Sequence, residues 1–263
     1  MGFAVGKTHH RSSSSNVSRP YDPTMDLADA VELIEITTGR IADLAGAADL
    51  TTPVERLGRW RAEDVVAHLG GVHEWASRIV RARSMDGPGF RKSKLRGAEL
   101  AAWYAETAAD LVETLRTSHP DDACPNFNPG SAPTTAFWIR RQLHETLIHA
   151  YDLDRVLGEI LPIPRSAAVD GIDEHLDVFI RTRGKQTLAA PLALTVTDGD
   201  ESWTLAPATK PGRVDVDPPN VEPVAVMTGS AMNVVLVLWN RLTVAEAKLE
   251  VSGDEAVVAS FRA

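Results

Sequence analysis

Apolar residues recur at helical spacing in four long segments of the first part of the chain. In the first segment, about residues 26–48, apolar side chains return every three or four positions from Leu27 to Ala45, and Asp26 is suited to cap the helix. The same spacing predicts three further helices, at about 62–83, 98–117 and 134–158. Four helices of this length joined by loops predict an antiparallel bundle.

The pattern changes after a linker that contains Pro162 and Pro164. One more helix is predicted over 167–181, and short apolar runs then indicate strands. These runs lie at 192–197, 203–206, 224–227 and 248–251. Asp198-Gly199-Asp200 predicts a hairpin turn between the first two of them.

A second helix of this region is predicted from Gly229-Ser230 to Arg241, and a short last helix begins at Asp254. The fold class is therefore predicted to be α+β with two domains, a four-helix bundle over 25–160 and a small α+β domain over 161–263. Residues 1–24 are polar and without period, and we expect them to form a disordered tail.

Composition and charge narrow the functional classes. The chain has 263 residues and a formal net charge of −9, so nucleic acid is not expected as a partner. No apolar run approaches the length of a membrane span, and a membrane is not expected either. The single cysteine, Cys124, excludes an intrachain disulfide and fits a cytoplasmic protein. It has no basic neighbour in sequence, so any reactive thiol is expected to come from outside the chain.

The segment from His144 to Asp152 carries the main chemical signal. Glu145 and His149 are four residues apart and project from one face of a helix on successive turns. His68 lies on the inward apolar stripe of the second predicted helix. Two imidazoles and one carboxylate can hold one divalent cation with an open coordination position, which suits zinc but also nickel, iron or manganese. We therefore predict His68, Glu145 and His149 as metal ligands, with Asp152 orienting one imidazole.

Each of these residues also has a plainer interpretation. The helix face that carries Glu145 and His149 is a solvated surface in that view, with Arg141 and Glu145 as an ordinary ion pair. A lone histidine such as His68 is often a hydrogen-bonded core residue, and Asp152 is then simply exposed. The coincidence of ligand types on two helices of one bundle favours the metal site. The remaining histidines are interpreted as structural or solvated: His9, His10, His73, His119, His144 and His175.

Several motifs resemble the mycothiol-dependent maleylpyruvate isomerase family. In the first domain they are Trp60–Gly71 and His144–Asp152, and in the second domain 170–174, 238–242 and 251–255. The resemblance spans nearly everything after the tail. It implies a DinB-like four-helix bundle followed by a small α+β domain like that of sterol-carrier proteins. The turn before Trp60 departs from the family because it lacks the expected Pro-Gly-Trp.

The resemblance also implies residue roles and a reaction. By motif match, the zinc ligands of the family fall on His68, Glu145 and His149, and its second-domain arginine falls on Arg241. Mycothiol is then the thiol cosubstrate, and the thiolate bound to the metal attacks an electrophilic substrate. The implied reaction is cis–trans isomerisation of an unsaturated diacid, whose carboxylate Arg241 would bind at two points. The alternatives are a mycothiol S-transferase for other electrophiles and a non-catalytic, metal-containing ligand-binding protein.

Overall fold

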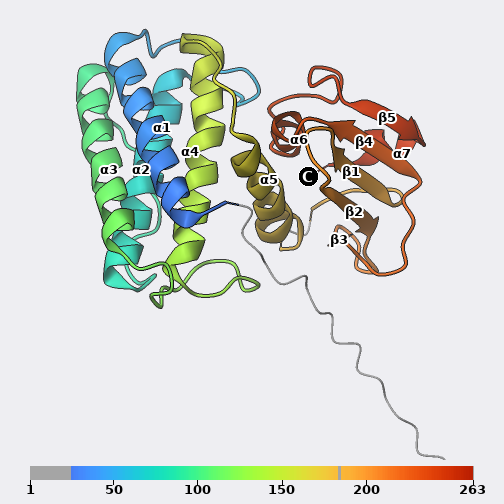
Figure 1. The fold of residues 1–263 in the computed structure, drawn as a ribbon. Helices are drawn as coiled ribbons and strands as arrows, with labels where there is room; N and C mark the ends of the chain where they lie inside the picture. The colour runs from blue at the N-terminus through green and yellow to red at the C-terminus, as the bar shows by residue number, and fades with distance from the viewer. Residues whose placement is uncertain (1–24, 183–184, 263) are drawn as a thin grey trace, which may run out of the picture.

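The computed structural model describes residues 25–182 and 185–262, so the predicted tail at 1–24 lies outside the described residues. The first part of the chain is the predicted bundle of four helices (Figure 1). Their bounds are α1 Leu27–Ala47, α2 Ala62–Ala82, α3 Gly97–Thr117 and α4 Thr135–Leu157. Asp26 caps α1 as expected, because its side chain accepts a hydrogen bond from the backbone N–H of Ala28 at 2.7 Å.

Two adjacent glycines of α2 let α3 and the segment between the two helices lie close to α2. A Cβ atom on Gly71 would stand 2.2 Å from the carbonyl oxygen of Arg91, and one on Gly70 would stand 2.5 Å from the ring of Trp103. Neither position therefore has room for a larger side chain. The close approach places Phe90 beside His68, with the two ring centroids 4.9 Å apart.

The second part of the chain is the predicted α+β unit, in which helices accompany a five-stranded sheet (Figure 1). The strands follow the order β3-β2-β1-β4-β5, and only the pairing of β1 with β4 is parallel. The helices are α5 Arg165–Glu174, the π-helix η1 His175–Ile180, α6 Ala231–Leu238 and α7 Glu255–Ser260. The strands are β1 Leu192–Val196, β2 Ser202–Pro207, β3 Val214–Val216, β4 Ala225–Gly229 and β5 Glu250–Gly253. The hairpin expected at 198–200 joins β1 to β2.

The predicted extension of α6 to Arg241 is wrong. The helix ends at Leu238, and Asn240 adopts a left-handed conformation with φ of 58°. The N–H of Arg241 donates to the carbonyl of Leu236 at 2.8 Å, and that of Asn240 donates to the carbonyl of Val237 at 2.9 Å. These two bonds form a Schellman motif, which closes the helix and turns the chain away. Arg241 therefore lies in the turn that follows α6.

The α5 helix lies between the bundle and the sheet (Figure 1) and joins them through buried charges. Asp170 on α5 accepts a hydrogen bond from Arg140 Nε at 2.9 Å, and its Oδ2 lies 2.6 Å from His144 Nε2. A Cβ atom on Gly171 would stand 3.1 Å from His144 Nδ1, so the glycine permits this close approach. His144 thus has a structural place at the junction, as its poor ligand spacing predicts.

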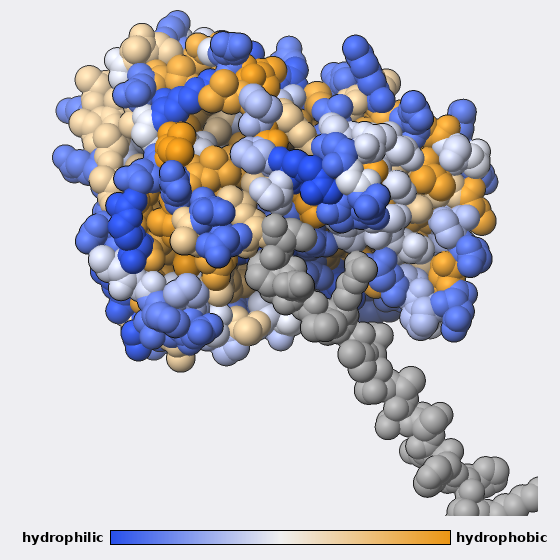
Figure 2. Space-filling view, viewed as in Figure 1, coloured by the Kyte–Doolittle hydropathy of each residue, from blue (hydrophilic) through white to orange (hydrophobic). Residues whose placement is uncertain are grey.

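In the part of the chain that the structure describes, no helix is long and apolar enough to cross a membrane. On the face shown in Figure 2, hydrophobic residues are interspersed with hydrophilic ones over both parts of the molecule. The exact domain boundaries remain a prediction.

Candidate metal centre

The three predicted ligands come together where α2 and α4 face each other. One ligand atom from each of His68, Glu145 and His149 lies within 4.8 Å of the others. The Oε1 atom of Glu145 is 3.1 Å from His68 Nε2 and 3.4 Å from His149 Nε2. Glu145 and His149 share a face of α4 because they are one turn apart, whereas His68 reaches the same point from α2.

The helix face that carries this cluster is not a solvated surface, so that plainer interpretation is wrong. Arg141 and Asp152 are buried, and His149 is only 7% exposed. The side chains of His68 and Glu145 are 20% and 16% exposed. His149 is therefore enclosed, and partial exposure remains at His68 and Glu145.

Aromatic rings flank the partly exposed side of the cluster, beside His68. The ring centroid of Trp60 lies 5.1 Å from that of His68, and Phe90 meets the same imidazole edge-on. The ammonium group of Lys92 lies 5.0 Å from the centroid of the Trp60 ring. A bound molecule would thus meet an apolar wall, while the charge of Lys92 is balanced by Asp64, whose Oδ1 accepts from Nζ at 2.7 Å.

The far nitrogen of His149 is held by a carboxylate from its own helix. His149 Nδ1 lies 2.9 Å from Asp152 Oδ2, so Nδ1 carries a proton that Asp152 accepts, and Nε2 faces Glu145. Arg241 grips the same carboxylate at two points, with Nε 3.0 Å from Oδ1 and Nη2 2.8 Å from Oδ2. The structure therefore places Arg241 beside the cluster, in contact with Asp152 rather than with the three predicted ligands.

The second oxygen of Glu145 is held from the other side. Arg141 Nη2 donates to Glu145 Oε2 at 2.8 Å, while its Nη1 donates to Glu174 at the end of α5. The four-residue spacing of Arg141 and Glu145 is visible in the sequence, but it is typical of an ion pair on a solvated helix face. Glu174 is 29 positions beyond Glu145 in the chain and on a different helix, so no local pattern links the two.

The ionisation of the cluster follows from these contacts. Burial lowers the pKa of His149, but the hydrogen bonds to Asp152 and Glu145 outweigh it and raise the pKa to about 9. Burial also raises the pKa of Glu145, yet the hydrogen bonds from His149 and His68 hold it well below its usual value. An ionised Glu145 is the form that a cation requires.

His73 shows the contrasting case of a buried histidine outside the cluster. Its side chain is fully buried, and burial lowers its pKa to about 3. Its Nε2 lies 3.2 Å from the hydroxyl oxygen of Thr146. The interpretation of His73 as structural fits this neutral, enclosed place in the bundle.

The donor set of the cluster fits a divalent cation. Two imidazole nitrogens and one carboxylate oxygen are the ligand types of open zinc sites. Asp152 on the far side of His149 is the usual outer partner of a metal-binding imidazole. The exposure of His68 and Glu145 leaves an approach for a further ligand.

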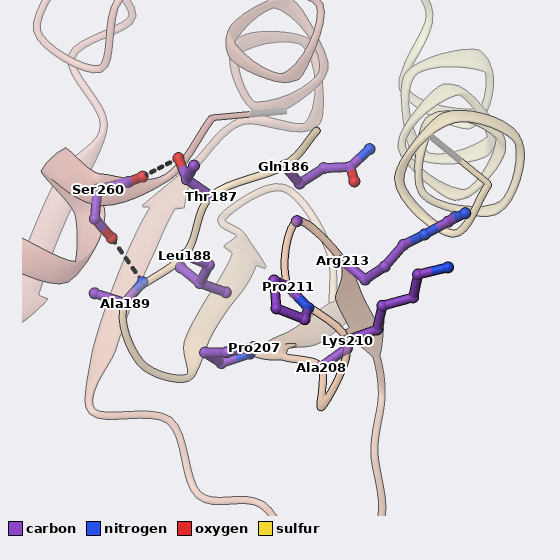
Figure 3. A pocket seen from close by; sticks show the side chains of 11 residues that line it. Gln186, Thr187, Leu188, Ala189, Pro207, Ala208, Lys210, Pro211, Arg213 and Ser260 are labelled. Carbon is purple, nitrogen blue, oxygen red and sulfur yellow. Dashed lines mark hydrogen bonds between the residues drawn. The ribbon is translucent and has the colours of Figure 1, made fainter. Parts of the chain in front are cut away.

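A separate open hollow of about 360 Å³ lies in the second domain, between residues 186–189 and 207–213 (Figure 3). Lys210 and Arg213 extend from its rim in the same direction (Figure 3). Its lining residues include none of the three predicted ligands, so this hollow does not belong to the candidate metal centre.

The fold and the cluster together define a class of two-domain protein in which a helical bundle carries a histidine–glutamate–histidine site and packs against an α+β unit. Two family models match the chain, the mycothiol maleylpyruvate isomerase N-terminal domain at residues 32–154 and the MDMPI C-terminal domain at residues 166–260. Together they cover most of the chain. The chain belongs to the mycothiol-dependent maleylpyruvate isomerase family.

Solved structures show the same fold. A crystal structure of the mycothiol-dependent maleylpyruvate isomerase and one of a histidine-to-alanine mutant each match with a TM-score of 0.63 and 15% identity. Each match covers 88% of this chain and 95% of the other chain. A comparison with curated proteins found no match.

Proposed function

We propose that this protein is a metal-dependent and thiol-dependent enzyme of the maleylpyruvate isomerase type. Its cosubstrate is mycothiol, and its substrate is an electrophilic unsaturated diacid that undergoes cis–trans isomerisation. The observation that carries the proposal is the convergence of His68, Glu145 and His149, two of which remain partly exposed. Membership of the family supports the choice of thiol and substrate class.

In this proposal His68, Glu145 and His149 hold the cation, for which zinc is the first candidate. When bound, the cation lowers the pKa of a coordinated thiol so that the thiolate exists at neutral pH. Asp152 keeps the proton of His149 on Nδ1, which leaves Nε2 free for the cation. Trp60 and Phe90 give the side of His68 an apolar surface against which a bound thiol could pack.

Arg241 is the proposed catalytic residue of the second domain. Asp152 fixes its guanidinium beside the cluster, and the side chain remains 13% exposed. A guanidinium is charged at all physiological pH values and binds carboxylates through paired N–H groups. We propose that its remaining N–H groups bind a carboxylate of the substrate.

The thiol of this chain is unsuited to the reaction. Cys124 is buried, and burial raises the pKa of its thiol. A neutral, enclosed thiol is a poor nucleophile. The nucleophile is therefore proposed to be the exogenous thiol.

Metal analysis tests the ligand set directly. The purified protein should hold about one divalent cation per chain, and His68→Ala and His149→Ala should each lower the occupancy sharply. His119→Ala is the control, because that histidine is largely exposed and far along the chain from the cluster. Full occupancy in the double variant of His68 and His149 would contradict the proposal.

Activity is then measured with the metal-loaded protein, mycothiol and a panel of unsaturated diacids and other electrophiles. Isomerisation regenerates the thiol, so its concentration stays constant while the substrate is converted. An S-transferase consumes one thiol for each substrate molecule. Conversion without mycothiol would overturn the thiol-dependent mechanism.

A further inference from the structure

Arg141 connects Glu145 to the second domain. Arg141 lies one turn before Glu145 on α4 and donates to its Oε2 atom at 2.8 Å. The same guanidinium donates from Nη1 to Oε1 of Glu174, the last residue of α5. The contacts thus lead from the second domain, through Arg141, to a proposed metal ligand.

These contacts are enclosed on all sides. The side chains of Arg141 and Glu174 are 5% and 2% exposed. The guanidinium carbon of Arg141 lies 5.2 Å from the ring centroid of Phe179 and 5.3 Å from that of Trp239, both in the second domain. A planar guanidinium that is paired at two edges and packed against two rings has one stable orientation. Arg141 is therefore a fixed donor to Glu145.

A fixed donor to one carboxylate oxygen of Glu145 orients the other oxygen toward the two histidines. Because Oε2 accepts from Arg141, Oε1 is the atom that faces His68 and His149. Glu174 also balances the charge of Arg141, which would otherwise place an uncompensated positive charge beside a cation site in a poorly solvated region. Removal of that balance should oppose cation binding.

We propose that Glu174 is a positioning residue that sets the affinity of the cluster of His68, Glu145 and His149 for its divalent cation. The inference rests on the metal site in the proposed function. It makes docking of the second domain and binding of the cation mutually stabilising, because coupling between two binding equilibria is reciprocal. Residues that hydrogen-bond to metal ligands, as Arg141 does to Glu145, typically change metal affinity by about 10-fold to 100-fold, and Glu174 acts through Arg141 at the lower end of that range.

The test is the dissociation constant of Zn²⁺, measured on the full chain by competition with a chelator and repeated with Co²⁺. Glu174→Gln keeps the shape of the side chain but removes its charge, and it should weaken Zn²⁺ binding by about 10-fold or more. Asp173→Asn is the matched control, since it makes the same change one residue earlier on α5. There the carboxylate accepts from Trp203 Nε1 at 2.6 Å, and the affinity should stay at the wild-type value.

A second readout does not depend on the chelator. Saturating Zn²⁺ should raise the Tm of the wild-type protein, and this rise should be smaller in Glu174→Gln at the same Zn²⁺ concentration. Wild-type affinity in Glu174→Gln would overturn the inference. An equal loss in Asp173→Asn would also overturn it, because the effect would then belong to any carboxylate on α5.

Arg141→Lys covers the case in which Glu174→Gln does not fold. Lysine keeps the charge, but its ammonium cannot reproduce the two-edged grip on Glu145 and Glu174, so a comparable loss of affinity is expected. Wild-type affinity in Arg141→Lys would overturn the inference. If the wild-type protein binds Zn²⁺ no better than His68→Ala, the proposed function itself fails.

Discussion

The charge state of His149 depends on its two carboxylate neighbours more than on its burial. Asp152 and Glu145 raise its pKa to about 9, whereas the enclosed His73 has a pKa of about 3. At neutral pH the imidazole of His149 is therefore positively charged, whereas that of His73 is neutral. A cation that binds His149 must displace a proton, which Asp152 and Glu145 otherwise retain on the imidazole.

Arg241→Ala tests whether the second domain contributes to catalysis. With metal in excess, the substitution should lower kcat/KM for an anionic substrate by about 100-fold or more, because a paired interaction with the carboxylate is lost. Arg241→Lys should recover only part of the loss, since an ammonium cannot grip a carboxylate at two points. Steady-state kinetics measures both. An unchanged kcat/KM in Arg241→Ala would remove this residue from the active site.

Asp173 provides a pH-dependent prediction. Burial raises its pKa to about 6, against 3.8 in the unfolded chain, although Trp203 donates a hydrogen bond to it. The folded state therefore binds the proton more tightly, and stability falls as pH rises from about 4 to 6. Asp173→Asn removes this cost while the amide oxygen still accepts from Trp203.

Asp173→Asn should accordingly raise the free energy of unfolding by on the order of 1–3 kcal/mol at pH 7.5, with little gain near pH 4. Denaturant unfolding of both proteins at the two pH values measures the difference. A gain of equal size at both pH values would show that the effect of the substitution does not come from the ionisation of Asp173.

At the scale of elements, the local pattern of apolar residues predicts most of the helices and strands, and contacts between distant segments explain the others. The four bundle helices could be placed to within about a residue or two because each has its own apolar stripe and end signals. The three-residue strand β3 has too few positions for an alternating pattern, and it exists because Val216 pairs with Leu205 on β2. The predicted helix over 167–181 becomes a π-helix from His175 onward, which periodicity does not reveal.

The same contrast holds for the candidate site. His68, Glu145 and His149 could be predicted because their spacing and helix faces are local properties of the sequence. Glu174 could not, since its contact with Arg141 depends on how α5 docks on α4. The proposed ligands were thus accessible to sequence reasoning, whereas the contact of Glu174 with Arg141 was not.

Asn240 is the residue that ends α6 and places Arg241. Its φ of 58° is tolerated by asparagine and glycine but costs other residues about 1–2 kcal/mol. Asn240→Ala should therefore lower the free energy of unfolding by about 1 kcal/mol and reduce kcat/KM, because the turn that carries Arg241 is disturbed. Asn240→Gly should leave both close to the wild-type values. Chemical denaturation and kinetics on the two variants give the comparison, and equal behaviour of Ala and Gly would exclude a role for the left-handed turn.

At the scale of the whole molecule, buried charges join the two parts. Asp170 on α5 contacts both Arg140 and His144 on α4, and its side chain is 3% exposed. Arg56 and Glu246 also form an ion pair between the bundle region and the second domain, but both side chains are considerably more exposed. Breaking a buried pair costs more stability than breaking an exposed one. The charge left behind is desolvated in the first case, whereas it remains solvated in the second.

Asp170→Ala should therefore weaken the docking of the two domains far more than Arg56→Gln. The first substitution leaves Arg140 and His144 enclosed without their shared carboxylate, and a loss of about 3–5 kcal/mol is expected for breaking a buried pair from one side. The second should leave the Tm unchanged, because it removes an exposed pair only.

Urea unfolding followed by tryptophan fluorescence should show one transition for the wild-type protein and for Arg56→Gln. In Asp170→Ala the curve should shift to lower urea or split into two transitions, as expected when coupling between the domains is lost. A wild-type curve for Asp170→Ala would show that the remaining contacts, including the Arg141–Glu174 and Arg241–Asp152 pairs, hold the domains together without Asp170.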